Sequence, residues 1–349
     1  MSDRLRVGLI GYGMAGRVFH APLVRAVPDL DLVAIATSRH DEVAALDPAI
    51  GCVADPQDIF ADPTIDLVVI ATPSATHAPL AAQALQAGKH VVVDKPFALT
   101  LADARSLATL AKAHGRHLAV FHNRRFDSDY LSIAHHIANG AIGRVTHFES
   151  HFDRFRPEIR DRWREDGSAG SGVWFDLGPH LVDQAIALFG TPLGVSADIA
   201  GLRAGSASDD WAHVILRYPD LRVILHASLN APDGTAGGSP RFAVHGTGGS
   251  LIKQALDLQE AQLIAGLRPG DAGWGHDPDP VRLFDGNGAM RECPALAGCQ
   301  DRFYRQLAST IRSGTALPVP INDALAVQAV IDAAMTSSQK GRYIDMMGD

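Results

Sequence analysis

The chain has 349 residues, of which 46% are hydrophobic and 20% are charged, and its formal net charge is −8. The length favours two domains, and the composition excludes a disordered or fibrous protein. Nucleic acids and anionic membranes favour basic patches, so this acidic chain is expected to bind a small molecule and neither nucleic acid nor a membrane.

The cysteines and the start of the chain suggest the compartment. Cys52, Cys293 and Cys299 are odd in number and lack the CxxC spacing of a zinc site or a redox pair. Residues 1–4 lead directly to an apolar strand, without the apolar run of a signal peptide or a membrane span. We therefore expect reduced thiols and a cytoplasmic location.

The first 122 residues alternate short apolar runs with amphipathic helices, which predicts a doubly wound parallel sheet, the Rossmann dinucleotide-binding domain. A parallel strand is buried on both faces and therefore shows a continuous apolar run. One helix is bounded by Thr100, which forms a capping box with Asp103, and by Gly115. The strands expected in this domain are 5–10, 32–37, 67–71, 90–93 and 117–121.

From residue 123 to residue 349 the strands become longer and alternate more strongly. This pattern predicts an α+β domain with a large, mainly antiparallel sheet, which serves substrate binding and oligomerisation. Val223, Leu225 and Leu229 are expected on an exposed sheet face that packs against a partner, so a homodimer or homotetramer is expected. The elements expected here are strands at 145–152, 211–218, 222–229 and 241–245, a turn at 246–249, a long surface loop at 266–295 and a helix at 322–340.

Residues 11–16 fit the GxGxxG pattern, and they follow the first strand and open a helix. In this context the first glycine permits the turn, the second lets the backbone approach a pyrophosphate, and the third lets the helix pack closely. The alternative is a plain glycine-rich turn. The residues expected to contact the cofactor here are Gly11, Gly13, Met14, Ala15 and Gly16.

The end of the second strand bears on the choice of cofactor. An NAD-binding domain usually has Asp or Glu there, to accept from the ribose 2′-hydroxyl, whereas this strand ends in Thr37-Ser38-Arg39. Ser38 can donate to a 2′-phosphate and Arg39 can pair with it, which favours NADP and leaves NAD as the alternative. Asp41 and Glu42 follow at once, and Arg39 has the alternative of a solvated loop cation.

Lys95 directly follows the strand expected at 90–93, at the carboxyl edge of the sheet, where open α/β sheets bind ligands. Its ammonium can hydrogen-bond a substrate oxygen. The alternative is an ordinary surface lysine in a Lys-Pro turn.

Asp176 and His180 are one turn apart at the start of an apolar helix, so they project from one face of it. Oxidation of an alcohol requires removal of the hydroxyl proton as hydride leaves carbon. Histidine is the usual proton carrier near neutral pH, and a nearby carboxylate can orient it or contact the substrate. The alternative is that Asp176 caps the helix and His180 is a partly buried structural histidine.

Together these residues resemble the Gfo/Idh/MocA (glucose-fructose oxidoreductase/inositol dehydrogenase) oxidoreductases, from the first strand nearly to the C-terminus. The glycine loop of that family falls on residues 11–16, its lysine-proline element on Lys95-Pro96, and its Asp-x-x-x-His element on Asp176 and His180. The resemblance implies that His180 is the general acid/base, that Lys95 supports the nicotinamide and the substrate oxygen, and that Asp176 holds the substrate hydroxyl. The glutamate that usually precedes the lysine is aspartate here, which should affect positioning more than chemistry.

Other segments resemble the branch of the family that contains NADP-dependent inositol dehydrogenases. The resemblance implies a substrate site that includes Asn123, Arg124, Asp153 and Arg156, because Arg and Asp can each form paired hydrogen bonds with a ring diol. The alternative is that residues 153–166 form a self-paired, solvated loop. The segments that carry this resemblance are 19–22, 122–125 and 149–157.

The resemblance also places Thr72, Pro73 and His77 along the cofactor cleft, with Lys95 and Arg124. For His77, capping of the helix start is the alternative. No metal is expected, because the histidines show no ligand pattern such as HExxH.

The function expected is transfer of hydride between NADP(H) and a CH–OH or C=O group of a small polyol, cyclitol or ketose, most directly inositol/inosose interconversion. One alternative is a sugar-processing enzyme with a tightly held cofactor, which performs a dismutation or a redox-assisted glycoside hydrolysis. The other is a non-catalytic NADP-binding sensor. A sensor would be expected to lack the lysine or the histidine, and this chain retains both.

Overall fold

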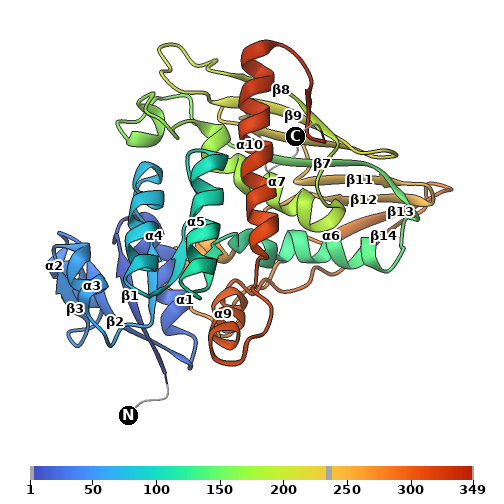
Figure 1. Cartoon of the computed structure of the whole chain (residues 1–349). Helices are drawn as coiled ribbons and strands as arrows, with labels where there is room; N and C mark the ends of the chain where they lie inside the picture. The colour runs from blue at the N-terminus through green and yellow to red at the C-terminus, as the bar shows by residue number, and fades with distance from the viewer. Residues whose placement is uncertain (1–3, 233–237, 348–349) are drawn as a thin grey trace. The chain divides into compact units, whose positions relative to one another are not determined.

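The computed structural model describes residues 4–232 and 238–347, and the chain divides into two compact units (Figure 1). Residues 1–3, which precede the first predicted strand, lie outside the described residues. The sequence does not predict that two segments from the second half of the chain join the first unit. The first unit consists of Met1–Asn123, Gln259–Trp274 and Cys299–Leu325, and the second of Arg124–Leu258, Gly275–Gly298 and Ala326–Asp349.

The first unit is built on a six-stranded parallel sheet with the order β3-β2-β1-β4-β5-β6, which confirms the predicted Rossmann fold. Every residue of β4 is buried, as expected for a strand covered on both faces. The strand order reverses between β1 and β4, and the carboxyl ends of these strands form the binding edge of such a sheet. The strands are β1 (Leu5–Ile10), β2 (Leu30–Ala36), β3 (Gly51–Val53), β4 (Leu67–Ile70), β5 (His90–Val93) and β6 (Leu118–Val120).

Helices cover this sheet: α4 packs on β4 and β5, and α5 lies beside α4 (Figure 1). Thr100 is the N-cap of α5 as predicted, because its hydroxyl oxygen accepts from the Asp103 N–H at 3.1 Å. Gly115 follows α5 with φ of +60°. The helices are η1 (Ala15–His20), α1 (Ala21–Arg25), α2 (His40–Leu46), α3 (Pro56–Ala61), η2 (Ser74–Thr76), α4 (His77–Gln86), α5 (Leu101–Ala113), α8 (Gln259–Ile264) and α9 (Asp301–Ser313).

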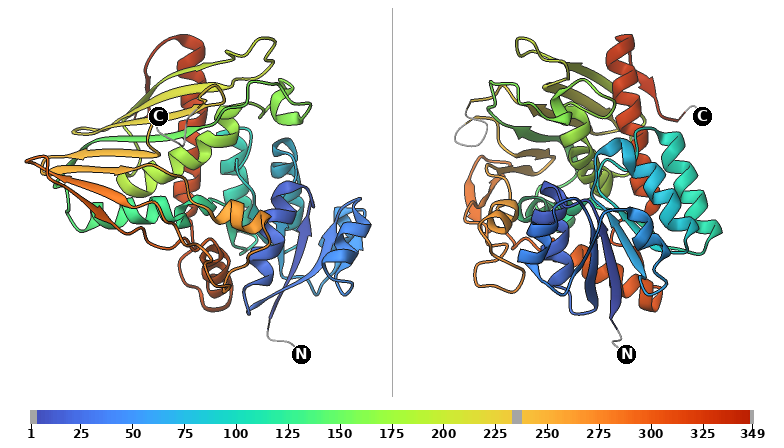
Figure 2. Two further views of the ribbon diagram at one scale, coloured as in Figure 1. Left: turned by 180° about the vertical axis from the view of Figure 1, so that it is seen from behind. Right: turned by 90° about the vertical axis from the view of Figure 1, so that its left-hand side faces the viewer.

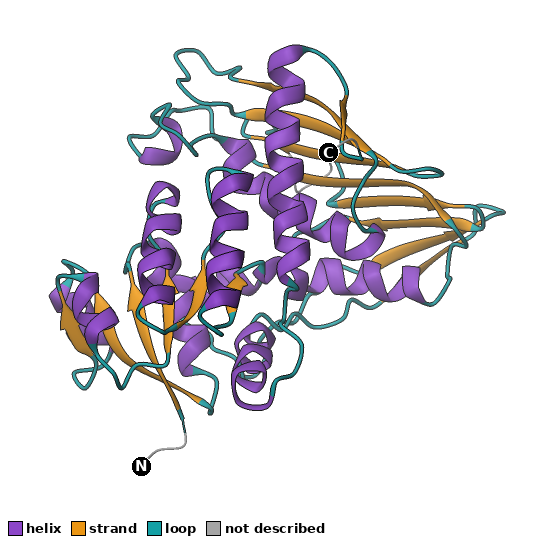
Figure 3. Cartoon of the chain, viewed as in Figure 1, coloured by secondary structure: helices purple, strands orange, loops and turns teal. Residues whose placement is uncertain are grey.

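The second unit is built on a nine-stranded sheet with the order β14-β13-β12-β11-β7-β10-β9-β8-β15 (Figure 3). Among the described strands of this sheet, only β7 and β10 pair in parallel, so the prediction of a large, mainly antiparallel sheet is confirmed. The strands are β7 (Val145–Asp153), β8 (Gly194–Ala200), β9 (Trp211–Arg217), β10 (Arg222–Ser228), β11 (Phe242–Gly246), β12 (Gly249–Lys253), β13 (Val281–Asp285), β14 (Met290–Cys293) and β15 (Ile344–Asp345).

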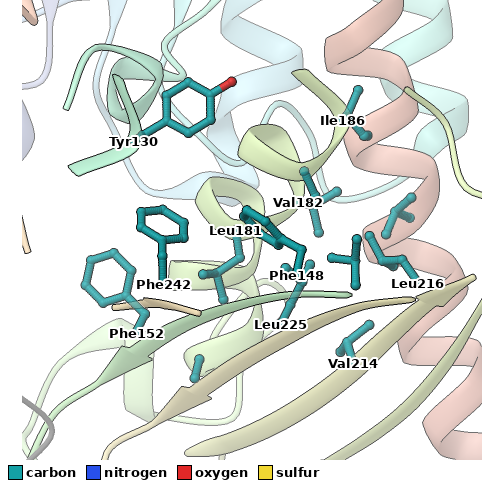
Figure 4. Packing of buried hydrophobic residues seen from close by; sticks show 14 of the residues in the cluster. Tyr130, Phe148, Phe152, Leu181, Val182, Ile186, Val214, Leu216, Leu225 and Phe242 are labelled. Carbon is teal, nitrogen blue, oxygen red and sulfur yellow. The ribbon is translucent and has the colours of Figure 1, made fainter. Parts of the chain in front are cut away.

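The long helix α7 packs on β7, β9 and β10, and Figure 2 shows this sheet from two further directions. Phe148, Leu181, Val182, Leu225 and Phe242 form the centre of this core (Figure 4). Full burial of each such side chain contributes about 1.5–3 kcal/mol, so α7 is firmly held. The helices of this unit are η3 (Asn123–Phe126), α6 (Ser128–Ala138), η4 (Trp163–Glu165), α7 (Val173–Phe189) and α10 (Ile321–Lys340), whose first residues belong to the first unit.

Two expectations are wrong in this unit. The surface loop expected at 266–295 contains β13 and β14, because pairing with β12 stabilises short segments that are rich in turn residues. Val223, Leu225 and Leu229 are 0%, 0% and 5% exposed in the core, not on an open face. These residues therefore no longer support the expected homodimer or homotetramer. The oligomeric state stays a prediction.

No helix among residues 4–232 and 238–347 is long and apolar enough to cross a membrane.

Candidate active site

The glycine loop of the first unit is shaped by close backbone packing. Gly11 has φ of +93°, its N–H donates to the Ala36 carbonyl at 3.0 Å, and a Cβ there would lie 2.5 Å from the Ala71 carbonyl oxygen. A Cβ at Gly16 would collide with the Gly11 carbonyl oxygen, whereas a Cβ at Gly13 would meet no atom within 4 Å. The space over Gly13 is what close approach of a phosphate to the backbone requires.

Met14 and Ala15 lie where the loop turns into helix, and Met14 is 50% exposed. The turn from Ala15 to His20 is π-helical, a form that often occurs at functional sites. Unpaired N–H groups at such a helix start favour anions.

Beside the glycine loop is a cavity of about 370 Å³ at the carboxyl ends of β1, β2 and β4, a volume suited to a small ligand or part of a cofactor. The free space over the Gly13 backbone fits the phosphates of a nicotinamide dinucleotide, and the largely apolar cavity beside it fits another part of the same cofactor. The cavity is lined by Ile10, Gly11, Ala36, Thr37, Pro56, Thr72, Pro73, Thr76, Pro79 and Leu80.

Ser38 and Arg39 are both exposed just after β2, and the Arg39 side chain is 53% exposed. The Arg39 Nη1 donates to Glu42 Oε1 at 2.7 Å, and Arg17 lies 3.6 Å from the other oxygen of Glu42. The Arg39 guanidinium is therefore exposed just after β2 and already pairs with Glu42.

His77 begins α4 and is 1% exposed. Its Nε2 lies 2.9 Å from the Thr72 carbonyl oxygen and its Nδ1 lies 2.8 Å from the Pro96 carbonyl oxygen. Burial lowers the pKa of His77, so the neutral ring donates to one of the two carbonyls at a time. His77 thus ties the Thr72-Pro73 turn to the Lys95-Pro96 turn, and Thr72 and Pro73 themselves line the cavity.

Lys95 is partly exposed directly after β5, and its peptide bond to Pro96 is cis. The Lys95 N–H donates to the carboxylate of Asp94 at 2.8 Å. Burial alone would raise the pKa of Asp94, but interaction with His20 and the nearby Lys95 ammonium bring it to about 2. The aspartate that replaces the usual glutamate is therefore an anion that holds the backbone of Lys95.

His20 and Tyr304 complete this part of the first unit. The His20 Nδ1 lies 2.6 Å from the Tyr304 hydroxyl, and its Nε2 lies 3.9 Å from Asp94 Oδ1. Both side chains are fully buried, and Tyr304 comes from α9, far along the chain.

Asp176 and His180 lie on the first two turns of α7, as expected. The Arg164 Nε donates to Asp176 Oδ1 at 3.1 Å, while His180 is 6% exposed and its ring lies 6.4 Å from that of Phe152. Asp176 does not cap the helix, because Gly172 occupies the cap position.

Arg124 is 6% exposed and directs its Nη1 to Asp127 Oδ2 at 2.9 Å. Its guanidinium carbon lies 4.9 Å from the centre of the Phe152 ring. The structure therefore brings the side chains of Arg124 and His180 to the same aromatic ring. Asn123, the last residue of the first segment of the first unit, is 5% exposed.

Asp153 and Arg156 are placed differently. Asp153 lies 3.5 Å from both His151 and His226, and the alternation of β7 puts it on the face opposite Phe152. The geometry thus gives its proposed substrate role no support. Arg156 is partly exposed in the loop after β7, and burial together with nearby arginines lowers its pKa.

Sequence reasoning missed Arg164 and Phe152 as partners of Asp176 and His180. The expectation of a self-paired loop at 153–166 is correct for Arg162, whose Nε lies 2.5 Å from Glu165 Oε1. Glu165 is buried, however, so the loop is anchored to the domain. Over residues 4–232 and 238–347 we find no group of three or more side chains arranged to hold a metal ion.

Two family profiles cover nearly all of the chain. The profile described as an oxidoreductase family with an NAD-binding Rossmann fold matches residues 5–122, and the profile of the C-terminal alpha/beta domain of the same family matches residues 134–346. The chain belongs to the Gfo/Idh/MocA oxidoreductase family. The family and its Rossmann domain establish an oxidoreductase that uses a nicotinamide cofactor.

Relatives within the Gfo/Idh/MocA family match over almost their full lengths. The oxidoreductase YdgJ of Escherichia coli (strain K12) is 48% identical, over 97% of this chain and 98% of its own. The scyllo-inositol 2-dehydrogenase (NADP(+)) IolW of Bacillus subtilis (strain 168) is 37% identical, over 98% and 96%. The structure of the oxidoreductase yvaA from Bacillus subtilis superposes with a TM-score of 0.95 at 36% identity, over 99% of both chains.

Proposed function

We propose that this protein transfers hydride between NADP(H) and a CH–OH or C=O group of a cyclitol or sugar, with inositol/inosose interconversion as the leading reaction. The observation that carries the proposal is the pair on α7, a buried His180 one turn from an Asp176 held by Arg164, in a chain that also has Lys95 at the binding edge of a Rossmann sheet. The printed names of two relatives, an NADP-dependent scyllo-inositol 2-dehydrogenase and an inositol 2-dehydrogenase, support a cyclitol substrate.

Each of these residues has a role in the proposed reaction. The bound nicotinamide would accept or supply the hydride. His180 takes the hydroxyl proton during oxidation and returns it during reduction, which a histidine does well near neutral pH. Asp176 accepts a hydrogen bond from a substrate hydroxyl, and Lys95 donates to the oxygen of the reacting carbon. Arg124 and Arg156, with Asn123, are proposed to contact the remaining hydroxyls.

For the cofactor we propose Gly11, Gly13, Met14, Ala15 and Gly16 at the pyrophosphate. Ser38 and Arg39 are proposed at the 2′-phosphate. Thr72 and Pro73 would line the nucleoside cavity. His77 would support the site indirectly, by hydrogen bonding with the Thr72-Pro73 turn and the Lys95-Pro96 turn. A cytoplasmic location is proposed from the three cysteines, which are free thiols in the structure.

The test is nicotinamide absorbance during incubation of the purified protein with NADP+ or NAD+ and a panel of inositols and sugars. We expect turnover of scyllo-inositol with NADP+, and a loss of about 10²–10⁴-fold in His180→Ala and Lys95→Ala. His245→Ala and Lys112→Ala are controls for loss of the same residue types at exposed positions. No turnover with any panel member would contradict the proposal.

The two alternatives have separate outcomes in this test. A sugar-processing enzyme with a tightly held cofactor would release NADP(H) only on denaturation and would show no net reduction of added NADP+. A sensor would bind NADP(H) without turnover, and binding would be unchanged in His180→Ala.

A further inference from the structure

Two loops of the second unit meet at the start of α7. The first loop, residues 154–172, provides the Arg164 carbonyl, which accepts from the Gly172 N–H at 2.8 Å. The second loop, residues 201–210, provides Asp209, whose carbonyl accepts from the Val173 N–H at 2.9 Å and whose carboxylate accepts from the Trp174 N–H at 2.7 Å. The N–H groups of Gly172, Val173 and Trp174, at the helix start, are therefore satisfied by these loops.

A buried guanidinium joins the two loops, which also meet through the Ser208 hydroxyl. The Arg203 side chain is 4% exposed, its Nε donates to Asp210 Oδ2 at 2.9 Å and its Nη2 donates to Glu165 Oε2 at 2.9 Å. Its Nη1 donates to the carbonyl oxygens of Arg156 at 2.9 Å and Glu158 at 3.1 Å. Only the planar, five-donor geometry of arginine can make this set of bonds.

The residues next in sequence to Glu165 and Asp210 contact the start of α7, which carries the proposed catalytic residues. Glu165 is next to Arg164, which donates to Asp176, and Asp210 is next to Asp209, which holds the first turn of α7. Arg203 therefore bonds the sequence neighbours of both residues, Arg164 and Asp209, that contact the start of the helix.

We propose that Arg203, with Glu165 and Asp210, is a positioning device that fixes the two loops so that Arg164 holds the Asp176 carboxylate in the orientation that receives the substrate. Arg203 and Arg164 are positioning residues. A carboxylate already held in one rotamer loses less entropy when substrate binds, and small displacements of such groups are costly in rate. This inference rests on the proposed function in one respect, the contact of Asp176 with substrate.

The first experiment compares Arg164→Gln and Arg164→Lys with Arg282→Gln. Arg282 is a matched control, because its side chain is 31% exposed and pairs with Glu292 at 3.5 Å, while that of Arg164 is 30% exposed. We expect kcat/KM for scyllo-inositol to fall about 10–100-fold in Arg164→Gln, mainly through KM, and to recover in part in Arg164→Lys. The Kd of NADPH and the unfolding temperature should stay at the values of the Arg282→Gln control. A kcat/KM equal to that of the control would overturn the orientation of Asp176 by Arg164.

The second experiment does not depend on turnover. Amide hydrogen exchange is measured by mass spectrometry in Arg203→Lys, which keeps the charge but loses most of the bonds. We expect exchange at residues 173–177 to accelerate by about tenfold or more, with residues 182–189 unchanged, because only the start of α7 loses its support. Unchanged exchange at 173–177 would overturn the role of Arg203.

The two experiments separate the inference from the proposed function. Faster exchange in Arg203→Lys in a protein that turns over no polyol would support the positioning device and contradict the polyol reaction. Should Arg203→Lys fail to fold, Glu165→Gln, which leaves Arg203 paired with Asp210, takes its place with the same expected exchange.

Discussion

The guanidinium of Arg39 pairs with the carboxylate of Glu42 at 2.7 Å, directly after the strand whose end selects between NAD and NADP. The pair is more than a third exposed on both sides, so its contribution to folding is small. In the proposed NADP complex, Glu42 would compete with the 2′-phosphate for the Arg39 guanidinium.

We therefore predict opposite effects of two substitutions. Arg39→Ala should weaken NADP+ about 10–100-fold relative to NAD+, whereas Glu42→Gln should strengthen NADP+ about two- to tenfold by releasing the guanidinium. Titration of both cofactors by fluorescence or calorimetry measures the ratio. Preference for NAD+ in the unaltered protein would contradict the role of Arg39.

The glycine loop allows packing and binding to be tested separately. Gly13→Ala should fold with normal stability, within about 0.5 kcal/mol, because the added Cβ meets no atom within 4 Å, but it should lose at least about tenfold in NADP+ affinity. Gly16→Ala should cost about 1–3 kcal/mol in stability, because its Cβ meets the Gly11 carbonyl oxygen in a rigid turn. Denaturant unfolding and cofactor titration check both variants. Normal cofactor affinity in Gly13→Ala would mean that the phosphates bind elsewhere.

Asp209 should make stability depend on pH. Burial raises the pKa of Asp209 from 3.8 to about 6, so the folded state favours its neutral form. The stability from this group is complete below about pH 4 and is lost as pH rises through about 6. Asp209→Asn, which still accepts from Trp174, should therefore be more stable than the parent by on the order of 1–3 kcal/mol at pH 8 and should show no gain at pH 4.

Thermal unfolding at the two pH values tests this prediction, with the exposed Asp220→Asn as control. A gain for Asp209→Asn that is the same at pH 4 and pH 8 would contradict the titration of Asp209.

Tyr304→Phe should destabilise the first unit. The substitution removes the hydroxyl that lies 2.6 Å from His20 Nδ1 and leaves a fully buried nitrogen without that partner, which costs about 1–3 kcal/mol. The denaturation midpoint should fall with an unchanged m-value. Tyr343→Phe is the control, because Tyr343 is 39% exposed, and equal midpoints for the two variants would show that the buried bond adds nothing.

Much of the first unit could be predicted from local sequence. The boundaries of β1 and β5 were predicted to the residue, because buried parallel strands are mainly apolar runs with polar residues or glycine at their ends. The start of α7, with Asp176 and His180 on one face, followed from helical spacing in the same way. β13 and β14 could not be predicted, because short strands in turn-rich sequence depend on a neighbouring strand for stability.

The contacts around the candidate site were less predictable than its residues. Arg203 and Glu165 are far apart in sequence, and nothing in the local pattern of either indicates that they meet. Asp153 was assigned by resemblance, and the alternation of β7 places it on the other face of the sheet. Spacing along an element indicates which side chains share a face, whereas partners from distant loops appear only in the folded chain.

The return of α9 to the first unit has a consequence for how the chain folds during synthesis. Phe303 and Tyr304 are fully buried there, and Phe303 lies 4.9 Å from Phe121 at the end of the Rossmann strands. When the ribosome has translated the six strands of the Rossmann sheet, it has not yet translated Phe303 and Tyr304. The core of the first unit is therefore completed only after most of the second unit has been translated. A fragment that stops near residue 122 would therefore expose the surface that α9 covers.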